Sequence, residues 1–369
     1  MAANLLQHDK FVAYARQLLP QMALSRIVNL GWVVLALLGS TDSHLSSLAE
    51  AIPLAATELS LEQRLRRWLK NAAIDVRQWY EPFIQAALQA YGGPVVYVVM
   101  DSTAYGAGCR ALVVGLAYAG QVLPLGWRVV KGQKGHTDSS LQNDLLSQIR
   151  PWLPRGQVVL VADSEFCSVD LLTPLRDWGW QFIVRVRGNI YLHTARGGSF
   201  TLAQARLSSG QTRVWRDVQW TQKHQFGPLM TIATWQPGEA EPLYVVTNTH
   251  NTQAALLVYS WRFWIEPLFG DYKGRGFRLG LSRLRDPERL SRLLLAASIA
   301  FVWSLALGSH IFHSAAQRLV DRNDRTDRSF FQLGYRFIRR CWKLAHAADI
   351  LFRLKADWFP VPLTLSTVR

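Results

Sequence analysis

Two runs of apolar, mostly β-branched residues constrain the fold of this chain most strongly, because each run ends at an aspartate. Residues 95–100 are followed by Asp101, and residues 157–162 are followed by Asp163. Short runs of this composition predict buried strands. On adjacent strands the two carboxylates would meet at one sheet edge and repel each other, unless a cation such as Mg²⁺ or Mn²⁺ lay between them. The alternative is that each aspartate is an ordinary turn residue.

The elements around these runs predict an α/β fold. Strands are expected at residues 111–118 and 122–130, joined by a turn at Ala119-Gly120-Gln121 that indicates an antiparallel hairpin. A helix capped by Asp138 or Ser139, a helix capped by Ser168 and a strand at residues 181–186 follow. Three strands and then alternating helix and strand give a mixed sheet with flanking helices.

The periodicity divides the chain into three parts. Residues 1–92 have a helical pattern, residues 93–312 contain the sheet domain, and residues 313–369 form a basic tail that we expect to be helical. Within the second part, residues 189–250 contain short strand-like runs separated by Gly, Ser and Pro. This stretch predicts a β-rich insertion in the sheet domain.

The charge of the chain favours a polyanionic partner. There are 41 Lys and Arg against 26 Asp and Glu, which leaves a net charge of +15 at pH 7. Nucleic acid is the usual partner for such a surplus, and an anionic membrane surface is the alternative. Residues 293–312 are almost long and apolar enough to span a membrane, but Ser298, Ser304 and His310 interrupt them. We expect a buried core helix there and no membrane partner.

The cysteines and the N-terminus favour a cytoplasmic location. Cys109, Cys167 and Cys341 lie far apart in the sequence, which indicates reduced thiols and argues against a zinc site. The first residues lack the basic and apolar regions of a signal peptide.

The N-terminal part contains a basic helix. A helix at residues 27–38 and a short helix at residues 45–52 precede a third at residues 61–71, which Ser60 and Gln63 would open as a capping box. The third helix carries four basic residues, namely Arg64, Arg66, Arg67 and Lys70. A short helix, a turn and a basic helix suggest a helix-turn-helix that reads the major groove of DNA. A solvated basic face on a helical bundle is the equal alternative.

Four polar residues of the segment 259–273 are spaced to share one side of a predicted helix. At about 100° per residue, Tyr259, Arg262, Glu266 and Lys273 fall within one narrow arc. That stripe offers a carboxylate for a metal ion between an arginine and a lysine for phosphate. The alternative is a surface salt bridge between Arg262 and Glu266.

Together these motifs resemble a known family. The order Asp101, Asp163 and then Tyr-x2-Arg-x3-Glu-x6-Lys is similar to that of the DDE transposases of bacterial insertion sequences, in particular the IS-four group. The resemblance covers residues from about 95 to 310. It implies an RNase H-like fold with the β-rich insertion between the second aspartate and the glutamate.

The resemblance also implies a chemistry. Asp101, Asp163 and Glu266 would be the catalytic residues and would hold two Mg²⁺ ions, for which Mn²⁺ can substitute. Tyr259, Arg262 and Lys273 would bind DNA near its cleaved ends. The partners would be the terminal inverted repeats of an element and a target DNA, both double-stranded, with a homodimer on paired ends. The expected function is cut-and-paste DNA transposition. Alternatives are an RNase H-like nuclease that only hydrolyses and an inactive DNA-binding regulator derived from a transposase.

The chain departs from the family pattern in two places. The group often has a basic residue and a small residue after the second aspartate, where this chain has Ser164 and Glu165. Pro267 follows Glu266 and removes a backbone donor, so the helix is expected to bend there. By resemblance Trp220 or Trp235 would hold a flipped base, with a place in the core as the alternative for each.

The remaining polar residues are interpreted as structural. Glu165 is expected in a first helical turn or facing solvent, with an extra metal ligand as the alternative. Asp271 and Asp286 are expected as surface charges, and His310 and His313 as ordinary helix residues. A group of arginines in the tail would contact flanking DNA or form a solvated face: Arg322, Arg325, Arg328, Arg336, Arg339 and Arg340.

Overall fold

Helices fill the N-terminal part of the chain. The computed structural model describes residues 2–363 except 106–107, 133–136, 196 and 323. The first helices are α1 (Ala2–Leu18), α2 (Leu24–Gly39), α3 (Leu45–Glu50), α4 (Glu58–Lys70) and α5 (Val76–Leu88). Helix α4 begins at Glu58, because the side chain of Thr57 accepts a hydrogen bond from the amide of Ser60. The predicted start of this helix at Ser60 is therefore wrong by one turn, since Thr57 is the better-placed cap.

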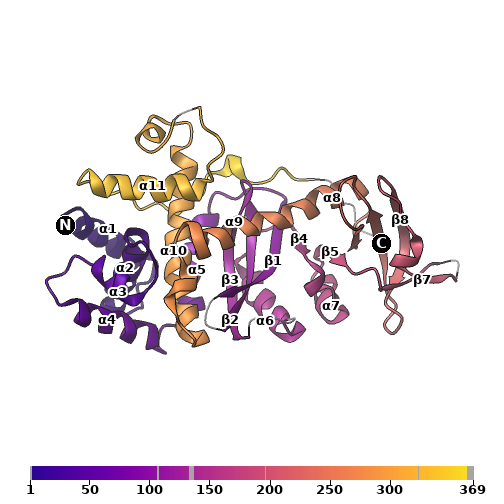
Figure 1. Ribbon diagram of the computed structural model, residues 1–369, viewed down its shortest axis with the longest axis horizontal. Coiled ribbons are helices and arrows are strands. Elements are labelled where there is room, and N and C mark those ends of the chain that lie inside the picture. Colours follow the sequence, from indigo (N-terminus) through magenta and orange to yellow (C-terminus); the bar gives the residue numbers. More distant parts are fainter. Residues whose placement is uncertain (1, 106–107, 133–136, 196, 323, 364–369) are drawn as a thin grey trace.

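A single large mixed sheet forms the centre of the molecule (Figure 1). Within the described residues its strand order is β3-β2-β1-β4-β5-β10-β9-β8-β6-β7. The first five in the chain are β1 (Val95–Tyr105), β2 (Cys109–Tyr118), β3 (Gln121–Lys131), β4 (Gln157–Ala162) and β5 (Gln181–Val186). Strands β1, β4 and β5 are parallel, and β2 and β3 are antiparallel to their neighbours. This mixed arrangement agrees with the predicted α/β class and is consistent with an RNase H-like fold.

The strands of the predicted insertion extend the same sheet. They are β6 (Tyr191–His193), β7 (Ser199–Thr201), β8 (Thr212–Trp220), β9 (Phe226–Thr234) and β10 (Leu243–Thr247). Strand β10 pairs antiparallel with β5, so the added strands continue the central sheet outward. The molecule is therefore elongated, with the N-terminal helices at one end and these strands at the other (Figure 1).

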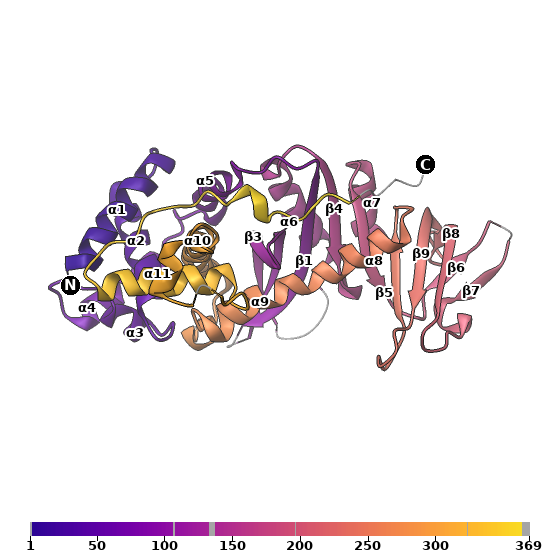
Figure 2. The same ribbon diagram turned by 90° about the horizontal axis from the view of Figure 1, so that it is seen from above.

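Helices cover both faces of the first five strands. Helices α6 (Ser139–Ile149) and α7 (Val169–Asp177) lie on one face, and a long helical run crosses the other face (Figure 2). That run consists of α8 (Thr252–Ser260), the 3-10 turn η4 (Trp261–Trp264), α9 (Ile265–Gly270) and the π-helical turn η5 (Asp271–Arg275). The predicted regular helix over residues 259–273 is thus interrupted. Pro267 has no amide hydrogen to donate to the carbonyl oxygen of Phe263, so the regular helical bond is missing at this point. Phe263 lies in the 3-10 turn η4, which is wound more tightly than an α-helix.

Helix α10 (Pro287–Ile311) packs between the N-terminal helices and the sheet. Among the helices that the structure describes, it is the one with the length and composition to cross a membrane, and 94% of its most apolar window is buried inside the protein. Its Ser298 and Ser304 are fully buried as well. The prediction of a buried core helix at residues 293–312 is confirmed.

The C-terminal tail is only partly helical. Helix α11 (Phe330–Lys343) crosses α10, but most of the chain after it is extended. The backbone there bonds to other elements: the amide of Ala348 donates to Gln7, that of Lys355 to Tyr118 and that of Leu363 to Tyr97. The tail therefore ties α1 to β2 and β1, and its amides are used in these contacts and not in a helix.

Two glycines permit the close crossing of α10 and α11. A Cβ added at Gly334 would lie 1.8 Å from the carbonyl oxygen of Ser304, and one added at Gly308 would lie 1.8 Å from that of Phe330. Both neighbours are backbone atoms, so an added Cβ could be accommodated only if the two helices moved apart.

We predict that Gly334→Ala lowers the free energy of unfolding by about 3 kcal/mol, as overpacking a rigid contact does. Helix propensity alone would give a gain of about 1 kcal/mol, so the sign distinguishes the two effects. Chemical denaturation measures the change. Gly280→Ala is the matched control, because a Cβ there meets nothing within 4 Å. Equal stability of the two variants would contradict the packing argument.

Candidate active site

Parallel pairing of β1 and β4 brings Asp101 and Asp163 side by side. Met100 pairs with Ala162, so the two aspartates that follow them are neighbours across the strands. The prediction that the first strand ends at Asp101 is wrong. Strand β1 continues to Tyr105, because residues 101–105 pair with residues 109–113 of β2. Asp163 lies directly after β4 and caps the 3-10 turn η2 (Ser164–Phe166).

The two aspartates share one backbone arrangement. Oδ1 of Asp101 accepts a hydrogen bond from the amide of Ser102 at 2.7 Å, and Oδ1 of Asp163 accepts one from the amide of Ser164 at 2.7 Å. Burial raises the pKa of Asp101 to about 6, and the negative charges of Asp163 and Glu165 add to the rise. The Ser102 amide and the Arg262 charge oppose it. Burial, more than the neighbouring carboxylates, therefore makes the charged form of Asp101 unfavourable.

The helical run opposite the strands supplies the other predicted residues. Arg262 lies between two carboxylates: its Nη1 is 3.2 Å from Oδ2 of Asp101, and its Nη2 is 3.5 Å from Oε1 of Glu266. The Arg262 side chain is buried and its Nε has no hydrogen-bond partner. Glu266 is 58% exposed, compared with 20% for Asp101 and 33% for Asp163. The glutamate thus faces the same site but keeps the freedom to move.

The guanidinium of Arg262 keeps the third carboxylate apart from the first. In the described part of the chain, no three His, Cys, Asp or Glu side chains are close enough together to hold a metal ion. Arg262 thus bridges Asp101 and Glu266, Asp163 lies beside Asp101 on the next strand, and the three carboxylates do not close into a metal cage. Arg262 balances the negative charge that a bound cation would balance.

Tyr259 and Lys273 also face this site. Burial raises the pKa of Tyr259 to about 12, the Asp163 charge adds to it, and Arg262 opposes it. Burial lowers the pKa of Lys273, and the charge of Asp101 opposes that shift. The four residues of the predicted stripe thus all lie on the side of the run that faces the aspartates, although the helix is irregular.

Glu165, predicted in a first turn or facing solvent, lies in the first turn of η2 but points into the site. Its Oε2 accepts a hydrogen bond from Oγ of Ser102 at 2.7 Å, and its Oε1 accepts bonds from the amide and hydroxyl of Thr137 at 2.9 and 2.7 Å. Nη1 of Arg110 lies 3.6 Å from the same Oε1. Burial raises the pKa of Glu165, but these bonds and the Arg110 charge outweigh burial and leave it below its ordinary value. Glu165 therefore fixes the chain beside Asp101.

Arg185 is a second residue that was missed. Ala162 pairs with Val184, so Arg185 follows in register beside Asp163 on the next strand. Its Nη1 is 4.0 Å from Oδ1 of Asp163, and its Nη2 is 2.7 Å from Glu241. The sequence did contain a sign of this role, because Arg185 is a charged residue between Val184 and Val186 in a mostly apolar strand.

Asp271 is not the surface charge that the sequence suggested. Its side chain is buried, which raises its pKa to about 7, and the charge of Arg275 opposes that rise. Its Oδ1 lies 3.3 Å from Nε of Arg275 within the π-helical turn. This π-helical turn points the side chain inward, and the sequence pattern did not predict the turn. Asp286 is exposed as predicted and caps α10 by accepting a bond from the amide of Arg289.

The basic residues of α4 lie at a distance from the aspartates and face different ways. Arg64 donates to Asn29 and, with Arg67, lines a groove that also contains Arg26. Arg66 pairs with Glu62 and lines a second groove on the other side of the helix. Lys70 is exposed at the end of α4.

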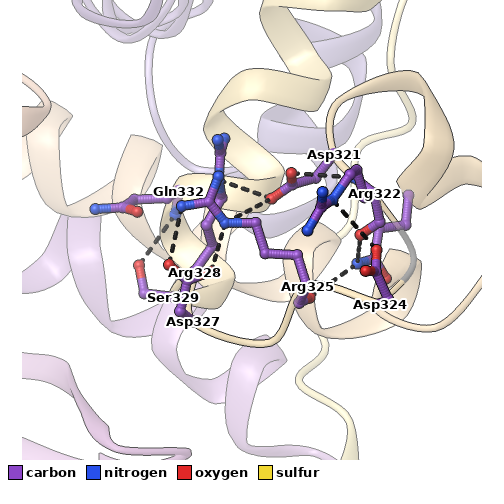
Figure 3. A network of polar contacts seen from close by, with 9 residues as sticks. Asp321, Arg322, Asp324, Arg325, Asp327, Arg328, Ser329 and Gln332 are labelled. Carbon is purple, nitrogen blue, oxygen red and sulfur yellow. Dashed lines mark hydrogen bonds and ion pairs between the residues drawn. The ribbon is translucent and has the colours of Figure 1, made fainter.

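Three of the six tail arginines are paired with nearby aspartates (Figure 3). Nε of Arg322 is 3.3 Å from Asp324, Nη2 of Arg325 is 2.9 Å from Asp327, and Nε of Arg328 is 2.7 Å from Asp321. Arg339 donates to the hydroxyl of Tyr335, whereas Arg336 and Arg340 are exposed. Much of the tail's positive charge is therefore balanced within the tail itself.

The other residues singled out from the sequence lie outside the site. Trp220 is buried in the core, and Nε1 of Trp235 donates to the carbonyl oxygen of Glu239. Nδ1 of His310 bonds to the carbonyl oxygen of Ala306 one turn earlier in α10. His313 lies in a turn after the end of that helix, so the prediction that it is a helix residue is wrong.

Comparison with known proteins identifies the family of the chain. A family model described as transposase DDE domain matches residues 100–303, which is more than half of the chain and includes both aspartates and the whole helical run. Comparison with curated proteins finds no match. The match over this span establishes the family, and with it the general function of a transposase that acts on DNA: the chain belongs to the DDE transposases.

Proposed function

We propose that this protein is a cut-and-paste transposase of the IS-four group, in which Asp101, Asp163 and Glu266 are the catalytic carboxylates. It would cleave DNA at the ends of an element and join those ends to a target. The observation that carries the proposal is the register of β1 and β4, which sets Asp101 beside Asp163 opposite Arg262, Glu266 and Lys273.

The donor set fits divalent cations. All three proposed ligands are carboxylates, and hard cations such as Mg²⁺ and Mn²⁺ prefer oxygen. Burial raises the pKa of Asp101, the charges of Asp163 and Glu165 add to the rise, and a cation bound there would stabilise the ionised carboxylate. Two Mg²⁺ ions held by Asp101, Asp163 and Glu266 would neutralise charge on the phosphodiester and lower the pKa of an attacking water or 3′-hydroxyl.

The remaining side chains of the site would hold the DNA. Arg262 would leave Asp101 when the cations bind and could then grip a phosphate through both Nη atoms. Lys273 would contribute a point charge near the same phosphate. With its pKa at about 12, Tyr259 keeps its proton at neutral pH, so its hydroxyl can donate a hydrogen bond to a phosphate oxygen.

The parts of the chain are assigned roles on the same basis. Residues 93–312 would form the catalytic domain, with residues 189–250 as its insertion, and residues 1–92 would bind the terminal inverted repeats. Arg67 and Lys70 are exposed on α4 and could contact phosphates. Arg67 donates to the carbonyl oxygen of Gln63 one turn earlier, whereas Arg64 and Arg66 bond to the side chains of Asn29 and Glu62. Family resemblance further suggests a homodimer on paired ends.

Metal binding is predicted to appear as a gain in thermal stability. Millimolar Mg²⁺ should raise the unfolding midpoint of the wild type, because the cation binds the folded state alone. Asp101→Asn and Asp163→Asn should lose this rise. Asp177→Asn, which alters an exposed aspartate at the end of α7, should retain it. An equal rise in all four proteins would exclude these carboxylates as ligands.

Without metal, the pH dependence of stability should also change. The pKa of Asp101 is raised from 3.8 to about 6 on folding, so its ionisation opposes folding as the pH rises through this range. A shift of two pKa units corresponds to roughly 3 kcal/mol. Asp101→Asn should therefore be more stable relative to the wild type at pH 7.5 than at pH 5 by roughly 1.4 kcal/mol, because about half of the effect already lies below pH 5. A difference independent of pH would contradict the assigned shift.

The enzymatic prediction concerns DNA that carries both flanks of the coding sequence. Asp101→Asn, Asp163→Asn and Glu266→Gln should each reduce Mg²⁺-dependent cleavage by orders of magnitude, because each removes a cation ligand. Binding of the same DNA in a gel shift should remain. Joined products in a plasmid assay would support transposition, and cleavage without joining would support the hydrolytic nuclease. Undiminished cleavage by the triple variant would refute the assignment.

A further inference from the structure

A basic groove lies between the N-terminal helices and the segment that connects the catalytic run to α10. Its volume is about 460 Å³. We call it the arginine groove, after its main lining residues: Arg66, Arg283, Arg285 and Arg289, together with His44. Arg283 and Arg285 are exposed, and neither belongs to any motif discussed above.

The acidic residues of the groove do not balance its arginines. Glu62 pairs with Arg66, and Oδ1 of Asp286 accepts the amide of Arg289 as the cap of α10. Within the described ranges, no ion pair involves the side chains of Arg283, Arg285 or Arg289. Three guanidinium groups on one concave surface repel each other, and a polyanion would relieve that repulsion. The tail arginines differ, since aspartates neutralise three of them (Figure 3).

The backbone at this groove favours glycine, yet the chain has arginine. Arg283 has φ +54° and Arg278 has φ +50°, and they flank the 3-10 turn η6 (Leu279–Ser282). Glycine adopts such angles without strain, whereas a residue with a Cβ does so at a cost. Arginine at a strained position is consistent with a role for its side chain.

The groove is adjacent to the catalytic edge of the sheet. The carbonyl oxygen of Arg285 lies 3.5 Å from Sγ of Cys109, and Cys109 pairs with Tyr105 on β1. Tyr105 is four residues beyond Asp101, or about 13 Å along an extended strand. On the other side, Oγ of Ser43 donates to the carbonyl oxygen of Arg278 at 2.7 Å and joins the segment to the N-terminal helices. The segment that lines the groove thus contacts the sheet at the end of the hairpin that carries Asp101.

We propose that the arginine groove binds the sugar–phosphate backbone of the duplex DNA that extends from the phosphate held at Asp101. This rests on the proposed function. Guanidinium forks match phosphate oxygens in pairs, so Arg283 and Arg285 would each bind a phosphate irrespective of base sequence. The groove would direct the duplex from the catalytic edge toward α3 and α4.

The test is the salt dependence of binding to a fluorescent 30-base-pair duplex by the full chain, in the absence of divalent metal. Arg283→Gln with Arg285→Gln should flatten the slope of log affinity against log salt by roughly 2, since each phosphate contact contributes about 0.9. The control is Arg155→Gln with Arg353→Gln, which removes the same charge from exposed sites elsewhere. Equal slopes for the two double variants would overturn the proposal.

Arg283→Gly separates binding from folding. Because glycine relieves the positive φ, thermal stability should not fall, whereas the salt slope should drop by roughly 1. A merely structural arginine would leave the slope unchanged, which would also overturn the proposal.

Cleavage and Mg²⁺-induced stabilisation, measured on the same proteins, distinguish this proposal from the proposed function. A wild type that neither cleaves nor responds to Mg²⁺, but whose slope falls with the groove variants, would refute the catalytic proposal and leave the groove as a DNA site. A wild type that cleaves, with slopes unaffected by the groove variants, would refute the groove alone.

Discussion

The crowding of carboxylates at one edge of a parallel strand pair governs the rest of this structure. Because Met100 pairs with Ala162, Asp101 and Asp163 are neighbours across the two strands. Glu165 lies in the 3-10 turn that follows Asp163. Like charges on neighbouring strands raise each other's pKa, and facing cations oppose that rise. The helical run from α8 to η5 supplies Arg262 and Lys273 on the facing side, and β5 supplies Arg185. Charge balance therefore links the sheet register to the packing of the run across it.

The scaffold around this edge keeps the elements in their places. Helix α10 is buried along nearly its whole length and contacts the N-terminal helices, β3 and α11. Gly308 and Gly334 let α11 approach α10 backbone to backbone, and the extended tail then bonds to Gln7, Tyr118 and Tyr97. Parts of the chain far apart in sequence are thus fixed against the same sheet. A site whose residues come from β1, β4 and α9 requires these elements to be held in fixed relative positions.

Much of the arrangement was predictable from local patterns. Apolar runs ending at Asp101 and Asp163 indicated the strands, and the spacing from Tyr259 to Lys273 indicated the facing side of the run, because both depend on short-range periodicity. Features set by contacts between distant residues were not predictable. Glu165 turns inward because Ser102, Thr137 and Arg110 meet it there. Asp271 is buried because a π-helical turn rotates it, and the tail is extended because its amides find partners on other elements.

The contact of Arg262 with both Asp101 and Glu266 was likewise not foreseen in this form. The sequence suggested either a phosphate-binding arginine or a salt bridge with Glu266, and the structure has the salt bridge together with a second bond to Asp101. An arginine that balances the carboxylates in one state and is released by cations in another would couple metal binding to the capture of phosphate.

The central claim is that these three carboxylates hold divalent cations. Anomalous diffraction from crystals of the protein with Mn²⁺ and DNA tests it most directly. The account predicts manganese peaks bound by side-chain oxygens of Asp101, Asp163 and Glu266, with Arg262 moved away from Asp101. Manganese bound elsewhere, or a site in which Arg262 still bridges Asp101 and Glu266 in the presence of metal and DNA, would contradict it.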